Sequence, residues 1–232
     1  MQGCLRDACA RILGAPVRLV GASRTDAGVH ALGQVASLDA PPRVPPLRLA
    51  QALNAVLPAA IRVLDAREAP DGFDARRAAL GKRYGYLIDR GRSADPFLRR
   101  YAWHRPQPLD VGAMARAAAS IRGAHDFSAF CAAPGRDRSP HCRVRAVRVV
   151  ARRHRVAVFL SADRFLHHMV RNVVGSLVEV GRGARPAEWL GEVLAGRDRA
   201  RAGPTAPAPG LGLIRVRYPR ELGGSGRRGP CF

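Results

Sequence analysis

The sequence predicts an α+β fold with an antiparallel sheet. Runs of alternating apolar and polar residues, typical of half-buried strands, occur in both halves of the chain and are interspersed with runs at helical spacing. Two alternating runs, 143–150 and 155–160, flank Arg152-Arg153-His154 and predict a β-hairpin. With 232 residues, 47% of them hydrophobic, the chain can bury a sizeable core in one large domain or two fused halves.

The first half shows helical and strand-like segments in turn. Leu5, Cys9 and Leu13 recur at helical spacing, and Gly14 ends that run as a typical helix C-terminus. Val17–Val20 is typical of a strand. The other elements expected here are strands over 34–38, 61–64 and 83–88 and a helix over 48–56.

The second half repeats this mixture. Asp110 is an N-cap candidate for a helix that runs to Ile121, and Asp163 is one for a long helix from about Phe165 to Val180. The remaining expectations are a helix over 186–194, a strand over 213–218 and a disordered Gly/Arg-rich tail over 223–230.

The charge of the chain points to a polyanionic partner. It has 39 basic and 18 acidic residues and a net charge of +21. A source that favours arginine would also raise this number, since Lys82 is the only lysine, but the asymmetry is typical of nucleic-acid binding. No basic amphipathic anchor, signal peptide or apolar run near about 20 residues is evident, so we expect no membrane association and a cytoplasmic location.

The cysteines indicate neither disulfides nor a zinc site. Their number is odd and no Cys-x-x-Cys pair occurs, so reduced thiols are expected. His167 and His168 suggest a metal, but neighbours on a helix point about 100° apart and would not chelate one ion together. We therefore expect no metal site.

A short segment from Arg24 to Val35 is the strongest candidate site. It places an arginine, the carboxylate of Asp26, glycines and His30 between two apolar runs. A carboxylate beside an arginine stays ionised at neutral pH and can act as an acid/base group or a nucleophile. Asp and Gly are also common turn residues, so the residue types alone leave an ordinary turn open.

The motifs together resemble those of the tRNA pseudouridine synthase I family. The catalytic signature R-T-D-A-G-V-H-A-x-G-Q-V is present in full from Arg24 to Val35. The F-L-x-x-M-V-R-N-x-V-G motif of the family matches 165–175, and its F-x-A-R element matches 73–76. The resemblance extends from Gln2 to about Tyr218.

This resemblance implies a pseudouridine synthase fold. In the family, two ferredoxin-like halves have a merged antiparallel sheet flanked by helices, with a central RNA-binding cleft. The implied halves are a catalytic one over 1–77, with its first strand apparently missing, and a second over 78–232 whose tail is disordered from about residue 220.

The resemblance also implies the activity and the site. The activity is isomerisation of uridine to pseudouridine at nucleotides 38 to 40 of the tRNA anticodon stem-loop, with no metal or organic cofactor. Asp26 would be the nucleophile with Arg24 beside it, and Arg171 would pair with Asp26. Tyr84 would lie over the uracil and Leu211 under it, although both residue types are common in cores. The other implied substrate-binding residues are His30 and Arg76, and the implied partners are tRNA and a second copy of the chain.

Two alternatives remain beside this interpretation. The family opens with a strand carrying Tyr-x-G-(Trp or Phe)-Gln, whereas this sequence starts inside the helix that follows it. It is therefore also consistent with a truncated, catalytically impaired tRNA-binding protein. A metal-dependent RNA hydrolase would need a carboxylate and histidine cluster with ligand spacing, and no such spacing is found.

Overall fold

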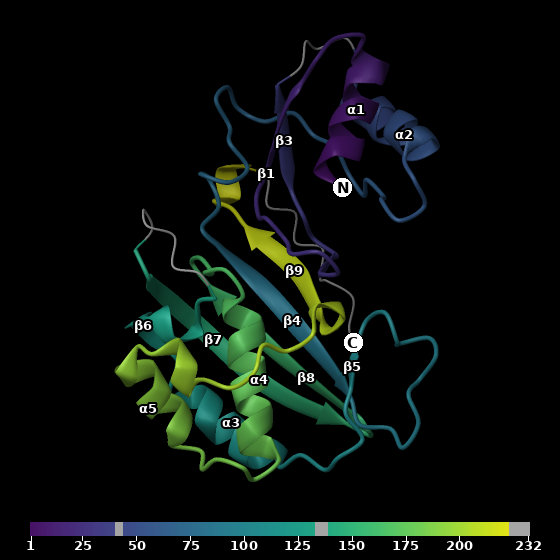
Figure 1. Ribbon diagram of the computed structural model, residues 1–232. Helices are drawn as coiled ribbons and strands as arrows, with labels where there is room; N and C mark the ends of the chain where they lie inside the picture. Colours follow the sequence, from purple (N-terminus) through teal and green to yellow (C-terminus); the bar gives the residue numbers. More distant parts are fainter. Residues whose placement is uncertain (40–43, 133–138, 223–232) are drawn as a thin grey trace. The chain divides into compact units, whose positions relative to one another are not determined.

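The protein is described by a computed structural model over residues 1–39, 44–132 and 139–222. Its described residues form two compact units (Figure 1). Unit 1 consists of Met1–Arg24, Gln34–Ala79 and the segment from Tyr218, and unit 2 consists of Thr25–Gly33 and Leu80–Arg217. Both units contain helices and strands, which confirms the α+β class. The tail predicted over 223–230 lies outside the described residues.

Unit 1 is built on two helices and one antiparallel strand pair. The helices are α1 (Gln2–Leu13) and α2 (Pro46–Val56), and β1 (Arg18–Gly21) pairs with β3 (Ala36–Asp39). Gly14 ends α1 as predicted, with φ 70°, and Pro46 begins α2, where the N–H that proline lacks is not needed. The buried core of the unit is small and consists of Cys9, Leu13, Leu53 and Leu57.

The strand predicted over 61–64 is wrong. This segment is irregular, and a side chain takes the place of a neighbouring strand. The Asn54 amide donates to the Val63 carbonyl at 2.8 Å and accepts from the Val63 N–H at 2.8 Å. The backbone is thereby satisfied without a ladder, so the apolar pattern alone was misleading.

Unit 2 contains a seven-stranded sheet in the order β2-β9-β4-β8-β7-β6, with β5 also paired to β4. Most neighbours are antiparallel, but the short strands β2 and β5 pair in parallel with β9 and β4. The hairpin predicted around Arg152-Arg153-His154 is confirmed. The strands are β2 (His30–Ala31), β4 (Gly81–Asp89), β5 (Trp103–His104), β6 (Gly123–Asp126), β7 (His141–Arg152), β8 (Arg155–Ala162) and β9 (Leu211–Arg217).

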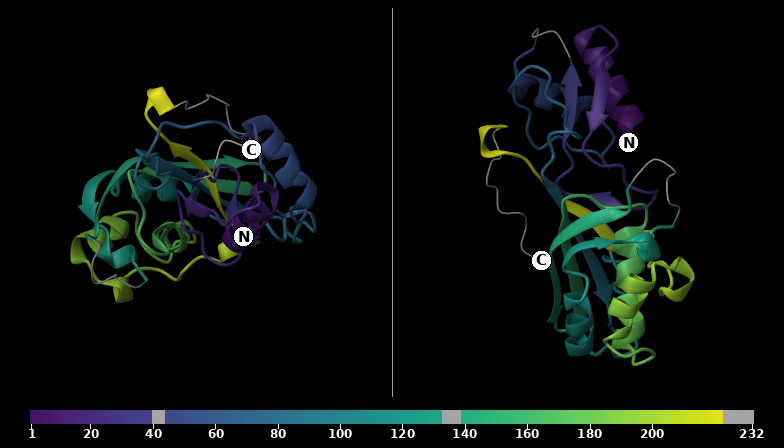
Figure 2. Two further views of the ribbon diagram at one scale, coloured as in Figure 1. Left: turned by 90° about the horizontal axis from the view of Figure 1, so that it is seen from above. Right: turned by 90° about the vertical axis from the view of Figure 1, so that its left-hand side faces the viewer.

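Three helices cover one face of this sheet (Figures 1 and 2). The central one, α4 (Met169–Gly181), has eleven of its 13 residues buried, as expected for a helix enclosed on all sides. Its neighbours are α3 (Val111–Ala119) and α5 (Trp189–Gly196). Asp110 caps α3 as predicted, because its side chain accepts from the Ala113 N–H at 2.8 Å. Short 3₁₀ turns are η1 (Ser128–Phe130), η2 (Arg199–Arg201), η3 (Ala208–Gly210) and, in unit 1, η4 (Arg220–Leu222).

The long helix predicted from Phe165 begins four residues later than expected. His168 has φ 60°, in the left-handed region, so the regular helix starts at Met169. Asp163 does not cap it. Its carboxylate instead accepts from the backbone N–H groups of Arg143 at 2.9 Å and Arg164 at 2.7 Å. This displacement places the residues before Met169 in a turn.

The predicted merging of the sheets has no counterpart among the strands of the described residues. These strands pair in two separate sheets, one in each unit. The segment Thr25–Gly33 belongs to unit 2 although it precedes residue 77 in the sequence. The domain boundary near residue 77 stays a prediction.

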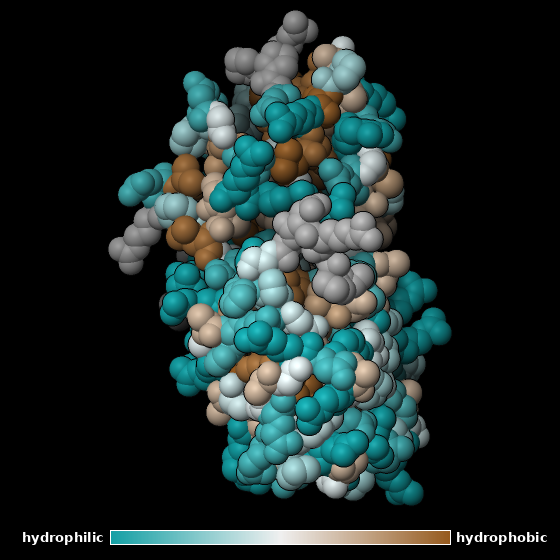
Figure 3. All heavy atoms as spheres, turned by 60° about the vertical axis from the view of Figure 1, so that its left-hand side comes forward, coloured by the Kyte–Doolittle hydropathy of each residue, from teal (hydrophilic) through white to brown (hydrophobic). Residues whose placement is uncertain are grey.

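The surface is mainly polar where it is drawn. On the face shown in Figure 3, hydrophilic residues predominate and hydrophobic ones emerge in patches between them. Within the described ranges, no helix has the length and apolar character needed to cross a membrane.

Candidate active site

Asp26 lies in a turn that is fixed to the edge of the large sheet. The Val29 N–H donates to the Asp26 carbonyl at 3.1 Å, and Gly28 between them has φ 79°. The chain then enters β2, where His30 is in register with Gly212 of β9. At Gly33 a Cβ would overlap the Ile214 carbonyl, so glycine lets the backbone approach β9 closely. The Asp26 side chain stays 29% exposed.

Arg171 provides the cation that holds Asp26. It is the third residue of α4, and its side chain is only 15% exposed. Its Nη1 donates to Asp26 Oδ2 at 3.2 Å, and its Nε donates to the Ala206 carbonyl at 2.7 Å. The resemblance implied this pair, and the two side chains do form an ion pair. The second hydrogen bond fixes the direction of the guanidinium.

The carbonyl that holds Arg171 belongs to a segment packed along α4, residues 199–206, which we call the strap. The buried Asn172 connects helix and strap, because its Oδ1 accepts from Thr205 Oγ1 at 2.7 Å and from Arg199 Nη2 at 3.1 Å. Its Nδ2 donates to the Phe130 carbonyl at 2.8 Å. At Gly175 a Cβ would overlap the Pro204 carbonyl, so only glycine permits this approach. The polar and glycine positions of the helix motif thus act together to place Arg171.

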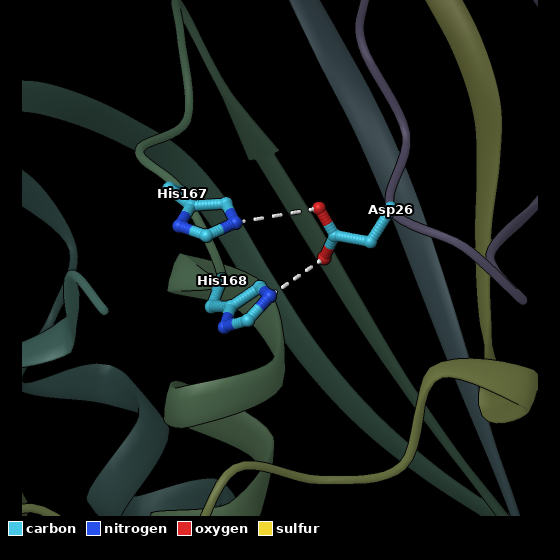
Figure 4. Close-up of side chains that lie close together, drawn as sticks. All are labelled: Asp26, His167 and His168. Carbon is cyan, nitrogen blue, oxygen red and sulfur yellow. Dashed lines mark ion pairs between the residues drawn. The ribbon is translucent and has the colours of Figure 1, made fainter. Parts of the chain in front are cut away.

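Two histidines that the sequence analysis set aside also lie at Asp26 (Figure 4). His168 Nε2 is 3.2 Å from Asp26 Oδ2, and His167 Nε2 is 3.7 Å from Oδ1. The prediction that they point apart assumed a helix, whereas both lie in the turn before α4 with ring centroids 3.9 Å apart. Burial lowers the pKa of His168; the Asp26 carboxylate acts against this, but His167 and Arg171 reinforce it.

Tyr84 and Leu211 occupy adjacent strands of the same sheet. Tyr84 is in β4, in register with Leu213 and 6% exposed, and its ring meets Phe165 edge-on at 5.0 Å. Leu211 is the first residue of β9 and is also buried. His30, by contrast, is engaged by the loop before β5, because its Nε2 lies 2.6 Å from the Arg100 carbonyl and its ring 4.7 Å from Tyr101.

The other two predicted site residues, Arg24 and Arg76, belong to unit 1. Both are exposed. Arg76 is anchored by its backbone N–H, which donates to Asp74 Oδ1 at 2.8 Å, and its Nε donates to the Gly21 carbonyl at 3.4 Å. Within unit 2, the structure therefore assembles Asp26, Arg171, His167 and His168. An oriented carboxylate that remains partly open to solvent is suited to nucleophilic or acid/base chemistry.

Comparison with known proteins identifies the family of this chain. The family model for tRNA pseudouridine synthase matches residues 1–76 and 117–219. A tRNA pseudouridine synthase A of Myxococcus xanthus is 46% identical over 219 residues, which cover 94% of this chain and 83% of the relative. One of Moorella thermoacetica is 48% identical over 218 residues, covering 94% of this chain and 89% of the relative. One of Frankia casuarinae is 47% identical over 230 residues, covering 95% and 81%. On this agreement along nearly its whole length, the chain belongs to the tRNA pseudouridine synthase family.

Proposed function

We propose that this protein is an enzyme that isomerises uridine to pseudouridine in tRNA, with Asp26 as its nucleophile. Relatives of more than 40% identity carry the name tRNA pseudouridine synthase A. The observation that carries the assignment of Asp26 is its ion pair with Arg171, which is held by the buried helix α4 and by the strap.

The reaction exchanges one bond to the ribose for another. Asp26 attacks the nucleotide, the bond from C1′ to N1 of the uracil breaks, and the base turns. A bond from C1′ to C5 then forms and the bond to Asp26 breaks, which restores the carboxylate. C5 loses its proton and N1 gains one, so the product is an isomer. Arg171 would hold the carboxylate aimed at the nucleotide.

The remaining site residues would bind the substrate. We propose that Tyr84 contacts the uracil from one side and Leu211 from the other, with Arg24, His30 and Arg76 binding around them. A uridine paired in a stem must leave the base stack to reach a carboxylate, so the enzyme would flip it out. The net charge of +21 would supply phosphate contacts along the tRNA.

The finer parts of the proposal rest on the family resemblance. The target would be nucleotides 38 to 40 of the anticodon stem-loop, and the enzyme would work as a homodimer in the cytoplasm without a cofactor. Mapping of pseudouridine in tRNA by carbodiimide modification tests the positions. Light scattering of the purified chain tests the dimer, and a mass of one chain at assay concentrations would contradict it.

Replacement of Asp26 tests the central assignment. Asp26→Asn keeps the shape of the side chain but removes the nucleophile, so turnover should fall at least about a thousandfold. The readout is tritium released from tRNA that carries C5-tritiated uridine, with tRNA affinity measured in parallel and expected to change little. Asp7→Asn is the matched control, because Asp7 is exposed and pairs only with its neighbour Arg6 in the described contacts. Turnover of Asp26→Asn within tenfold of the unmodified enzyme would overturn the assignment.

A further inference from the structure

The three side chains drawn in Figure 4 have the geometry of a metal-binding site. One ligand atom each from Asp26, His167 and His168 lie within 4.8 Å of one another. His168 Nε2 is 3.2 Å from Asp26 Oδ2, and His167 Nε2 is 3.7 Å from Oδ1, the other oxygen of the same carboxylate. A tetrahedral zinc ion with bonds of about 2.0–2.1 Å keeps its ligand atoms roughly 3.3 Å apart, so small side-chain movements would complete the site.

The backbone before α4 creates this arrangement. On a helix the two imidazoles would point in different directions, but the left-handed conformation of His168 turns both rings toward the same carboxylate. The site is also open. The side chains of His167, His168 and Asp26 are 51%, 25% and 29% exposed, which leaves room for an ion to enter and for water as a fourth ligand.

We propose that Asp26, His167 and His168 bind a zinc ion that reversibly inhibits the enzyme. Imidazole nitrogens combined with one carboxylate suit zinc, whereas magnesium and calcium prefer oxygen ligands alone. The bound ion would occupy the carboxylate that must attack the nucleotide. The inhibitory role therefore rests on the proposed function, while the binding of zinc does not.

Arg171 determines how tightly the ion binds. Its guanidinium is 3.2 Å from Asp26 Oδ2 and repels a second cation at the same carboxylate. The site would therefore release zinc readily and act as a regulatory site, in contrast to a closed structural one. It follows that Arg171→Gln should bind zinc more tightly, by roughly tenfold, although the same change should lower turnover. An affinity that is unchanged or weaker in this variant would contradict the geometry.

Zinc binding is measured first without RNA. The full chain is titrated with zinc alone against a chromophoric chelator, and we expect one ion per chain at this site. His167→Ala should weaken binding by at least about tenfold, because even outer-shell partners of a metal ligand are worth that much. His154→Ala is the matched control, since His154 is similarly exposed (48%) and lies in the turn between β7 and β8. Equal loss in both variants, or no loss in His167→Ala, would overturn the proposal.

Cobalt distinguishes this site from the cysteines. The chain contains five of them, and thiolates also bind zinc. Cobalt(II) at Asp26 and the histidines should show only weak d–d absorption. Intense thiolate-to-cobalt charge transfer that persists in His167→Ala would overturn the proposal.

Tritium release at buffered zinc concentrations then tests the inhibition. The zinc concentration that halves turnover, relative to the zinc-free rate of each variant, should rise at least about tenfold in His167→Ala and stay unchanged in His154→Ala. Zinc binding by a chain that never forms pseudouridine would contradict the proposed function and the inhibitory role but leave the metal site. An active chain that zinc neither binds nor inhibits would overturn the metal site and leave the function.

Discussion

The helices of the two units differ in how far they are buried. In unit 2, α4 is enclosed by the sheet, by its neighbouring helices and by the strap, and eleven of its 13 residues are buried. In unit 1, α1 buries only Cys9 and Leu13, and α2 only Ala50 and Leu53. The cation that holds Asp26 comes from the enclosed helix. The difference teaches that the candidate site is positioned by the more deeply buried unit, whose helix α4 holds Arg171 in place.

Glycine-to-alanine substitutions should show the largest difference in stability between the two units. Gly175→Ala forces a Cβ into the Pro204 carbonyl, so the free energy of unfolding should fall by at least about 3 kcal/mol as strap and helix separate. Gly14→Ala has no heavy atom within 4 Å of its Cβ and costs only its left-handed backbone, about 1 kcal/mol. Urea titration of both variants measures the difference. Equal losses would show that the strap does not need its close approach.

Truncation of one buried leucine in each unit tests whether the two units unfold independently. Leu177→Ala in α4 leaves a cavity at a fully buried position and should destabilise by about 3–4 kcal/mol. Leu53→Ala should cost about 2–3 kcal/mol, because partly buried neighbours can move into the space. Hydrogen exchange should quicken in α1 and α2 for Leu53→Ala and stay unchanged in α4. Faster exchange in α4 would mean that the units unfold together.

Asn172 and Asn54 provide a closer comparison, because the side chain of each one hydrogen-bonds to a segment outside its own helix. Asn172→Ala releases the strap that orients Arg171, so it should cost about 2 kcal/mol and lower kcat roughly tenfold with little change in KM. Asn54→Ala releases the Val63 segment in unit 1 and should cost about 1 kcal/mol without a change in kcat. A tenfold loss of kcat in Asn54→Ala would show that unit 1 shares in the positioning of the carboxylate.

The smallest expected effect is a dependence of stability on pH. Burial would raise the pKa of Asp126 in unit 2, but hydrogen bonds from Ser128 and the Arg197 charge outweigh it, so the pKa is lowered. The Arg77 N–H likewise lowers the pKa of Asp74 in unit 1. A lowered pKa stabilises the folded state above the unfolded-state pKa, and this contribution disappears as the pH falls through the folded-state value. Asp126→Asn and Asp74→Asn should each flatten the stability curve on the acid side of 3.8, the usual pKa of an aspartate. Stability curves of the variants that match the curve of the unmodified protein below that pH would contradict the lowered pKa values of the two aspartates.

Local patterns predicted the elements whose ends are marked by single residues. Gly14 ends α1, Asp110 caps α3, and the hairpin between β7 and β8 lies where alternation predicted it. The pairing of Asp26 with Arg171 followed from resemblance, because no local pattern relates residues 145 positions apart.

The errors came from interactions that a local pattern does not contain. The Asn54 side chain satisfies the backbone of a segment that looked like a strand. The left-handed His168 delays the start of α4, and that one backbone angle changed two histidines from neighbours pointing apart into a pair facing Asp26. Positive φ is uncommon at residues other than glycine, even though histidine is among the types enriched there, so the local pattern did not predict it at His168.

The parallel pairing of β2 with β9 also determines when the site can form. During synthesis, the turn that carries Asp26 is made long before β9, the strand against which it is fixed. The Arg171 side chain likewise cannot be oriented until the Ala206 carbonyl that accepts its hydrogen bond has been made. Loop closure over such a distance is slow and follows the local hairpins and helices. A nascent chain would therefore carry its carboxylate unoriented until β9 has been made, which delays the chemistry until the whole large sheet has been assembled.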